Sequence, residues 1–459
     1  MTRRFFYPIM AIIAPFRGLT YDFNAFSDPS LLMAPPYDVI SEEEQNLYYQ
    51  ANPFNVIRLV LGRNKTGDSD WDNRYTRAAD RFNRWKSEDI LIRRDLPAMY
   101  LTSLTYNPGD GSDLRVRWGM ICLVRIEEED AGVILPHERT FSAHKDDRLK
   151  LMRACNAQLS QIFGLYEDPV GNVHRFFEGV RGVKPQVDFD FRDGTNHKMW
   201  IIQDRGLFKK VAETMGHKAV FIADGHHRYE TARNYRNLMR ARYGRRPINR
   251  SYEYVMMYLT SMDDAGLTIL PSHRLIKATS GFQAAPFFDR IKPWFETETI
   301  SPSGSSHLEA CLSLKRRLEE KGRTTNVIGF RHHGDGAFYL LSLKPGAEET
   351  LEDLHPSLKK LDVILLSRLL LQRGLGFTRE DLDNEKIFHY ESNLAKAVSE
   401  VDTGSCQMTF ILNPTKMAQV REVAGNALIM PRKSTYFYPK VLTGMVFNQI
   451  DPHEIIQLQ

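Results

Sequence analysis

Short apolar runs alternate with helical stretches in the first half of the chain. Strands are predicted where apolar or alternating runs are bounded by Gly, Pro or Asp, at residues 11–14, 56–61, 98–105, 117–126 and 219–223. A further strand is expected at 254–261. Residues 75–88 repeat apolar side chains at helical spacing, which predicts an amphipathic helix with one face formed by Ala78, Ala79, Phe82 and Trp85. This alternation indicates mixed α and β structure with a sheet in the middle.

The pattern changes after about residue 277, where Gly, Ser and Pro interrupt residues 279–306. Beyond this stretch we expect, in order, a helix at 307–321, strands at 327–330 and 337–343, a leucine-rich helix at 361–371 and a strand at 407–412. Such an order is typical of an α+β domain. The chain is therefore expected to comprise an N-terminal extension (1–9), a first, catalytic α+β domain with a mixed sheet (10–277) and a C-terminal α+β domain (278–459).

The composition of the chain excludes several classes of protein. The chain of 459 residues is too long for one ordinary core, and its 42% hydrophobic share is that of ordinary globular proteins. Its four cysteines are widely spaced and form no CxxC pair, so no disulfide framework or zinc ribbon is predicted, and a reducing cytoplasm fits best. The apolar run 5–16 contains two prolines and is much shorter than the roughly 20 residues of a membrane span. No membrane association is expected.

The net charge of +4 is small for a nucleic-acid-binding protein of this length. One dense basic stretch, residues 233–250, carries several arginines together with Tyr235 and Tyr243. It is either an RNA or DNA patch or a solvated helix followed by a basic loop. The near-neutral total favours the second interpretation, so a nucleic-acid partner is not expected.

The strongest candidate for chemistry is the segment 219–232, where an apolar strand is expected to end at Asp224. Gly225 allows a sharp turn, and a helix follows whose inner face is expected to carry Tyr229, Ala232 and Leu238. A strand, a glycine turn and a helix N-terminus together direct backbone N–H groups and a positive dipole end at one point. Such a turn suits a phosphate or a carboxylate.

The side chains at this turn, Asp-Gly-His-His-Arg, can also take part in chemistry. Asp224 can bind magnesium or accept a proton, while His226 and His227 can donate protons to a reacting oxygen or relay them. Arg228 can clamp a phosphate. The alternative is that Asp224 only caps the helix and that the histidines are surface bystanders.

Two further polar clusters are candidates. The first places His137, Glu138 and Arg139 side by side in an expected loop, followed by Lys145 and Arg148 near a helix start; the alternative is a surface loop of mixed charge. The second is the segment 430–440, in which phosphate oxygens could be held by Lys433, Ser434, Thr435 and Lys440. No glycine-rich cradle precedes this segment, so it is not a P-loop, and it could instead be a packed aromatic loop joining two domains.

These segments, taken with residues 34–41, 52–59 and 270–274, resemble the signature blocks of domain-of-unknown-function family 1015. The blocks stand in the family's order and cover nearly the whole chain from Met10. The family has no settled activity. The resemblance adds Arg274 to the candidate phosphate-binding residues.

The Asp-Gly-His-His-Arg turn is also similar to the motif of the ParB/sulfiredoxin-like superfamily, which includes nucleotide-dependent free serine kinases. This local resemblance implies a ParB/sulfiredoxin-like first domain that binds nucleotide phosphates and transfers a phosphoryl group to or from a small hydroxyl compound such as serine. Sulfiredoxins need a catalytic cysteine beside the turn, and this chain has His226 and His227 there. Sulfinic acid reduction is therefore not expected.

We therefore expect a phosphotransferase that depends on Mg²⁺ and on a nucleotide, ATP or ADP, and that acts on a small phosphorylated amino or hydroxy acid, with serine and phosphoserine as the candidate pair. Asp224 is assigned to the metal or to the substrate hydroxyl, with Glu138 as an alternative general base. The basic side chains named above are assigned to phosphate oxygens. The rival hypotheses are a phosphatase that uses the same groups, and a ParB-like nucleotide switch that binds DNA through residues 233–250.

Two spatial expectations follow from this assignment. His137 and Glu138 should lie in the same cleft as residues 224–228, because a phosphate site needs more cations than one turn supplies. The C-terminal domain should close over that cleft and bring residues 433–440 to its mouth.

Overall fold

The computed structural model describes residues 11–109, 113–138, 142–277, 281–300 and 307–458. Two compact units are present. Unit 1 consists of Met1–Pro136, Thr140–Thr268 and Pro439–Gln459, and unit 2 consists of His137–Arg139 and Ile269–Tyr438. After Thr268 the chain forms most of unit 2, and it returns to unit 1 at Pro439.

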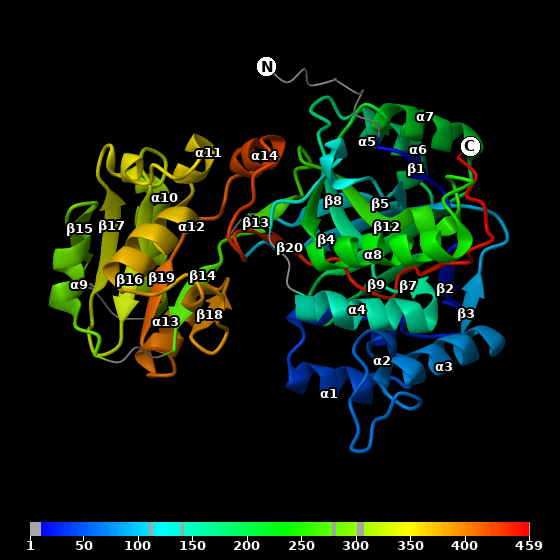
Figure 1. Cartoon of the computed structure of the whole chain (residues 1–459), viewed down its shortest axis with the longest axis horizontal. Coiled ribbons are helices and arrows are strands. Elements are labelled where there is room, and N and C mark those ends of the chain that lie inside the picture. Colours follow the sequence, from blue (N-terminus) through cyan, green and yellow to red (C-terminus); the bar gives the residue numbers. More distant parts are fainter. Residues whose placement is uncertain (1–10, 110–112, 139–141, 278–280, 301–306, 459) are drawn as a thin grey trace. The chain divides into compact units, whose positions relative to one another are not determined.

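A nine-stranded mixed sheet forms the centre of unit 1 (Figure 1). Its spatial order is β6 (Ile134–Leu135), β11 (Val220–Asp224), β8 (Ile162–Tyr166), β12 (Tyr254–Ser261), β5 (Arg115–Arg125), β4 (Met99–Tyr106), β10 (Asn196–Ile202) and β9 (Val187–Asp190), and β1 (Ile13–Ala14) also pairs with β5. The pairs β6–β11 and β8–β12 are parallel, and the other pairs are antiparallel. Two short pairs accompany the sheet: β2 (Leu19–Tyr21) with β3 (Leu91–Arg93), and β7 (Ala157–Gln158) with β21 (Asn448–Gln449). The expected α+β fold with a mixed sheet is confirmed.

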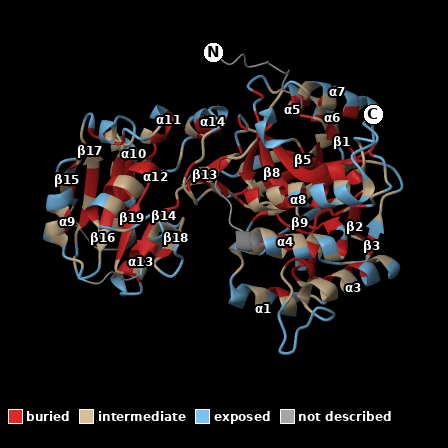
Figure 2. Cartoon of the chain, in the orientation of Figure 1, coloured by how far each residue is buried: buried red, intermediate tan, exposed pale blue. Residues whose placement is uncertain are grey.

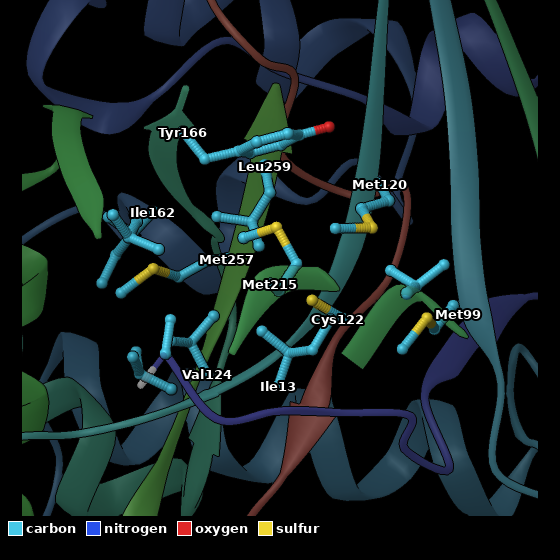
Figure 3. Packing of buried hydrophobic residues seen from close by; sticks show 14 of the residues in the cluster. Ile13, Met99, Met120, Cys122, Val124, Ile162, Tyr166, Met215, Met257 and Leu259 are labelled. Atoms are coloured by element: carbon cyan, nitrogen blue, oxygen red, sulfur yellow. The ribbon is translucent and has the colours of Figure 1, made fainter. Parts of the chain in front are cut away.

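The main core of unit 1 forms around this sheet. Strand β12 has the sequence YVMMYLTS, and seven of its eight residues are buried. Such unbroken apolar strands are typical of sheets covered on both faces. Figure 3 shows Met99, Met120, Cys122, Met257 and Leu259 packed together from three neighbouring strands. Exposed residues gather on the outer faces of the helices (Figure 2).

The helices of unit 1 are mostly amphipathic. They are α1 (Glu42–Ala51), α2 (Ile57–Val60), α3 (Arg74–Ser87), α4 (Ser142–Cys155), α5 (Asn172–Phe176), α6 (Glu178–Arg181), α7 (Arg205–Met215) and α8 (His226–Tyr243). The described residues of unit 1 also contain the short 3-10 helices η1 (Pro29–Leu32), η2 (Tyr37–Val39), η3 (Glu129–Ala131) and η4 (Ser251–Glu253). Helix α3 confirms the expected amphipathic helix, because it buries Ala78, Phe82 and Trp85. No helix in the described residues is both long and apolar enough to cross a membrane.

Residues 56–61 were wrongly expected to form a strand. They contain the short helix α2, which the side chain of Asn55 fixes in place. Its Oδ1 accepts a hydrogen bond from the Ile57 backbone N–H, and its Nδ2 donates to the carbonyl oxygens of Leu31 and Met33. A short segment rich in apolar residues fits a buried helix as well as a strand, so the pattern could not distinguish them.

The expected inner face of α8 was partly wrong. Tyr229 and Ala232 are buried as expected, but Leu238 is 46% exposed. Tyr235 and Arg236 are buried on this helix instead. The long Arg236 side chain donates to the Ile126 carbonyl oxygen at 2.7 Å, so a buried arginine occupies a position that a hydrophobicity pattern assigns to solvent.

An antiparallel six-stranded sheet forms the centre of unit 2. Its order is β15 (Phe295–Ile300), β17 (Phe338–Leu343), β16 (Val327–His332), β19 (Met408–Ile411), β14 (His273–Ile276) and β18 (Phe388–Glu391). Its helices are α9 (Ala284–Ile291), α10 (His307–Lys321), α11 (Pro356–Lys359), α12 (Asp362–Leu365), α13 (Leu394–Asp402) and α14 (Met417–Gly425), with 3-10 helices η5 (Ala347–Thr350) and η7 (Asp381–Asp383). The strands β13 (Thr268–Leu270) and β20 (Tyr436–Tyr438) pair separately. The expected leucine-rich helix is present as α12 followed by the π-helix Leu366–Gly374.

Two leucines in unit 1 test this account of the core. Leu259→Ala removes a fully buried side chain from β12 and should lower the free energy of unfolding by about 2–5 kcal/mol. Leu238→Ala makes the same chemical change on the exposed face of α8 and should alter it by about 0.5 kcal/mol or less. Urea unfolding followed by circular dichroism measures both. Equal losses in the two variants would contradict the placement of Leu238.

Candidate functional site

The turn between β11 and α8 brings together a cluster of charged side chains in unit 1. Strand β11 ends at Asp224, and Gly225 follows with φ +93° and ψ 30°, which is left-handed backbone that favours glycine. A Cβ atom at Gly225 would lie 2.8 Å from Nε of Arg228. The missing side chain therefore makes room for the guanidinium group of Arg228 to fold back across the turn.

Asp224 accepts hydrogen bonds from two cations. Its Oδ2 lies 2.5 Å from Nη2 of Arg228, and its Oδ1 lies 3.0 Å from Nζ of Lys440. The side chains are 16%, 12% and 12% exposed for Asp224, Arg228 and Lys440, so this ion triad is largely withdrawn from solvent. Burial alone would raise the pKa of Asp224, but the charges of Lys440 and Arg228, with a smaller contribution from His226, hold it well below its usual value.

The hypothesis that Asp224 only caps the helix does not describe this geometry. The N-cap of α8 is Gly225, and no side chain makes a cap hydrogen bond there. Helix α8 has 18 residues and so presents a full helix dipole at this turn. The carboxylate of Asp224 instead orients Arg228 and Lys440, which leaves the triad with an excess of one positive charge.

The two histidines occupy the first turn of α8. His226 is buried and His227 is partly exposed. The charge of His226 contributes to the low pKa of Asp224, so the two side chains interact electrostatically. Both residues lie where the dipole of α8 and the ion triad meet.

Further polar groups extend the site beside α8. Nη1 of Arg228 donates to the Gln161 carbonyl oxygen, and Nε2 of Gln161 donates to the Leu442 carbonyl oxygen at 2.7 Å. The guanidinium of Arg148 lies 4.0 Å from the ring centroid of Tyr37. Burial raises the pKa of Tyr37 to about 12, and the charges of Arg148 and Arg228 oppose this shift. A small cavity of about 50 Å³ is lined by Tyr37, Arg148 and Arg228 among other residues.

Lys145 and Arg148 both lie on α4 and contact other parts of unit 1. Nζ of Lys145 lies 2.8 Å from Oε2 of Glu230 on α8. Arg148 bonds to Asp147 and donates to the Val60 carbonyl oxygen at 2.7 Å. Lys145 thus forms an ion pair with α8, whereas Arg148 lines the cavity beside Arg228.

The other predicted residues belong to unit 2. Nε2 of His137 lies 3.1 Å from Oγ1 of Thr435, and Oγ1 of Thr435 donates to Oε1 of Glu138 at 3.5 Å. Ser434 donates to the Pro431 carbonyl oxygen at 2.6 Å, so its hydroxyl holds the loop. Arg139 lies outside the described residues. The expectation that His137 and Glu138 share a cleft with residues 224–228 stays a prediction.

Arg274 is buried in unit 2 and bonds to backbone carbonyl groups. Its guanidinium donates to the carbonyl oxygens of Ser272, Arg432 and Lys433 and lies 4.5 Å from the ring centroid of Tyr390. Burial lowers the pKa of this arginine. Lys433 itself has a positive φ of +55°. Arg274 therefore anchors the loop that carries Lys433 to Thr435.

The side chains that contact Asp224 are cations, whereas a metal site needs several carboxylate, histidine or cysteine ligands. Among the described residues, the group of His, Cys, Asp or Glu side chains close enough to share a metal ion consists of His389, Glu391 and Glu400 in unit 2. Both carboxylate oxygens of Asp224 already accept from cations. Two residues beside the turn, Tyr37 and Gln161, were not predicted from the sequence as site residues. Tyr37 belongs to the 34–41 block, whereas nothing in the sequence points to Gln161.

Three arginines of the basic stretch 233–250 form ion pairs with carboxylates of unit 1. Arg233 pairs with Glu129, and Arg236 with Glu128. Arg240 contacts both Glu128 and Glu253, the latter through two hydrogen bonds of 2.6 and 2.8 Å. These arginines hold α8 against neighbouring segments of the same unit.

These observations define an α+β protein with a mixed sheet and a strand–glycine–helix turn at which two cations meet one carboxylate. The chain belongs to the DUF1015 family of proteins of unknown function, whose model matches residues 13–364. The matched region ends before the segment 430–440. The local resemblance to ParB/sulfiredoxin-like proteins stays a prediction.

Comparison with other known proteins gives distant likenesses. No curated protein matches the chain. A conserved hypothetical protein from Pyrococcus furiosus is 11% identical, with a TM-score of 0.33 over 70% of this chain and 92% of that one. A free serine kinase variant in complex with ADP is 10% identical, with a TM-score of 0.35 over 77% and 97%. SbnI with a C-terminal truncation, from Staphylococcus aureus, is 10% identical, with a TM-score of 0.32 over 70% and 85%.

Gly225 can be tested against a matched glycine. Gly194 also has a positive φ, +81°, but a Cβ atom there would meet nothing within 4 Å. Alanine in left-handed backbone should cost about 1–2 kcal/mol at either position. Gly225→Ala should cost more than Gly194→Ala in urea unfolding, because its Cβ displaces the Arg228 guanidinium from the turn. If both variants lose the same stability, Arg228 does not require the open space at Gly225.

Proposed function

We propose that this protein is a nucleotide-dependent phosphotransferase that acts on a small hydroxyl-bearing acid, and that the ion triad Asp224, Arg228 and Lys440 with the N-terminus of α8 binds the phosphoryl group. The observation that carries the proposal is the convergence of two cations on one carboxylate at the start of an 18-residue helix. Helix N-termini favour anions, and arginine and lysine side chains favour phosphate oxygens. The proposed ligand of the turn is therefore a phosphate.

Asp224 serves in this proposal as a positioning residue. Because its pKa is held well below the usual value, it stays ionised near neutral pH and is a weak proton acceptor. Its carboxylate keeps Arg228 and Lys440 oriented, and the two cations are then preorganised for the charge on a transferring phosphoryl group. Such preorganisation costs little reorganisation when the ligand arrives.

Asp224 is not placed to coordinate the expected Mg²⁺ ion. A magnesium ion takes oxygen ligands in near-octahedral geometry, whereas both oxygens of this carboxylate face ammonium or guanidinium groups. No step of the proposal is therefore assigned to a metal. Arg228, Lys440 and the α8 dipole supply the positive charge instead.

In the proposed reaction the substrate hydroxyl oxygen forms a bond to the terminal phosphorus of the nucleotide, and the bond from that phosphorus to the bridging oxygen breaks. The hydroxyl proton passes to the neutral imidazole of His227, which stands in the first turn of α8 beside His226. Serine, with phosphoserine as the product, is the candidate substrate that the resemblance of the turn suggests. Lys145 and Arg148 are assigned to phosphate oxygens of the nucleotide, as expected from the sequence.

Lys440 gives the sharpest test of this proposal. Lys440→Gln should lower nucleotide-dependent phosphate transfer to serine by about 10²- to 10³-fold, because it removes one preorganised cation from the phosphoryl group. Lys209→Gln, an exposed lysine on α7 of the same unit, is the matched control and should transfer at the parental rate. Transfer from radiolabelled ATP or ADP to serine, and from phosphoserine in the reverse direction, measures both.

The rival functions predict different results in the same assay. If the protein releases inorganic phosphate from phosphoserine without any nucleotide, it is a phosphatase and the phosphotransferase proposal is wrong. If neither reaction occurs and the protein binds DNA with a steep salt dependence, the ParB-like switch is favoured. Parental transfer by folded Lys440→Gln would remove the ion triad from the mechanism.

The low pKa of Asp224 also predicts how stability depends on pH. A carboxyl whose folded-state pKa is lowered adds stability above its unfolded-state pKa of about 3.9 and loses that stability as the pH falls toward the folded value. The loss of stability caused by Asp224→Asn should therefore be largest near pH 7 and should shrink as the pH is lowered from 5 to 3. Urea midpoints measure this loss, with Asp95→Asn, an exposed carboxylate, as the control. A loss that does not change with pH would contradict the ion triad.

A further inference from the structure

Unit 1 contains a second cationic cavity, formed by α1, α2, α3 and the segment between α2 and α3. Its volume is about 350 Å³. The residues that line it include Arg58, Arg63, Lys65, Arg74, Arg77 and Arg81 but no carboxylate. Arg58 belongs to the 52–59 block, which the proposed function does not use. The cavity shares no lining residue with the β11–α8 turn.

The charges of this cavity are only partly balanced. Arg77 contacts Asp68 and Asp72, and Arg74 contacts Asp147. The remaining four cations form no close ion pair with a carboxylate of the described residues, although the hydrogen bond from Arg77 and, in smaller part, the charge of Lys65 lower the pKa of Asp68. Six cations thus face three carboxylates, all of which stand outside the lining.

The hydrogen bonds of the unbalanced cations go to neutral groups. Nη2 of Arg58 donates to the Tyr49 carbonyl oxygen at 2.6 Å, and Arg63 donates to Oδ1 of Asn46. Arg81 donates weakly to the Arg77 carbonyl oxygen at 3.5 Å. These bonds fix the directions of the guanidinium groups without cancelling their charge.

Arg58 shows most directly that the cations crowd one another. Burial lowers its pKa, and the charges of Arg81 and Arg63 act in the same direction. Its Nε is buried and has no acceptor among the described residues. A buried N–H group without an acceptor is costly, and an oxyanion in the cavity would supply both the acceptor and the missing negative charge.

Tyr49 limits the shape of the ligand. The guanidinium carbons of Arg58 and Arg63 lie 4.5 Å and 4.1 Å from the centroid of its ring. Two guanidinium groups thus lie over this one ring and occupy the surface on which a base would stack. The ring therefore orients the arginines and offers no stacking surface for a nucleobase.

We infer that this cavity is a binding site for a compact polyphosphate anion, separate from the β11–α8 turn. Planar guanidinium groups bind phosphate oxygens in pairs, and a chain of phosphates can contact several cations at once. The volume of about 350 Å³ suits an anion of this size, and the two arginines over the Tyr49 ring compete with any base that would stack there. The inference stands whether or not the phosphotransferase proposal is correct.

The test measures binding of sodium tripolyphosphate to the full chain by titration calorimetry at low salt. It is made in a protein carrying Arg228→Gln and Lys440→Gln, so that binding at the β11–α8 turn does not contribute. Adding Arg63→Gln, Lys65→Gln and Arg81→Gln should weaken the affinity by about tenfold or more, since three charge-assisted contacts are lost. Adding Arg84→Gln, Lys209→Gln and Lys210→Gln removes the same net charge from exposed positions outside the cavity and should leave the affinity within about twofold.

Thermal unfolding of each protein shows that loss of binding is not loss of folding. ATP should bind this site no more tightly than tripolyphosphate, because the cavity has no surface for its base. Absence of saturable tripolyphosphate binding would overturn the inference. Equal weakening in the two sets of variants would also overturn it, because the attraction would then depend on net charge alone. If ATP binds much more tightly through the same residues, the ligand of the cavity is a nucleotide and the inference of a compact polyphosphate is wrong.

Discussion

The contact on which the candidate site depends is the pairing of one buried carboxylate with two cations. Asp224 ends a central strand, Arg228 lies one turn into the following helix, and Lys440 comes from a segment 216 residues away in the sequence. Each cation alone would be costly to withdraw from water, and so would the carboxylate. Together they form a largely buried group with one surplus positive charge, at the positive end of a helix dipole. The position of the phosphate site proposed here depends on that surplus.

Local features of this arrangement could be predicted from the sequence. The apolar run before Asp224, the glycine and the following helix all indicate a strand–turn–helix unit, and the structure has it. The role of Asp224 could not be predicted, because the sequence gives no sign that Lys440 reaches it. The predictions for Leu238 and for residues 56–61 were wrong for a related reason. A buried arginine takes the inward position on α8, and the side chain of Asn55 stabilises α2. Hydrophobicity patterns do not include such contacts.

Helix α4 connects the two cationic regions of unit 1. Asp147 on this helix contacts Arg74, which lines the second cavity, and it also contacts Arg148, whose guanidinium lies over Tyr37 beside Arg228. One carboxylate is thus shared between an arginine of each region. An anion that attracts Arg74 competes with Asp147 for it, and Asp147 then interacts more strongly with Arg148. Asp147 is therefore the contact that the two cationic regions have in common within unit 1.

The path of the chain has a consequence for synthesis on the ribosome. Unit 2 is inserted between parts of unit 1, and the final part of unit 1 begins at Pro439. The strand β21, which pairs with β7, and the cation at Lys440 are both made after the whole of unit 2. A nascent chain can therefore bury most of the central sheet early, while Asp224 waits for its second partner until the last segment leaves the exit tunnel. Chains released early would keep the Asp-Gly-His-His-Arg turn but would lack its lysine.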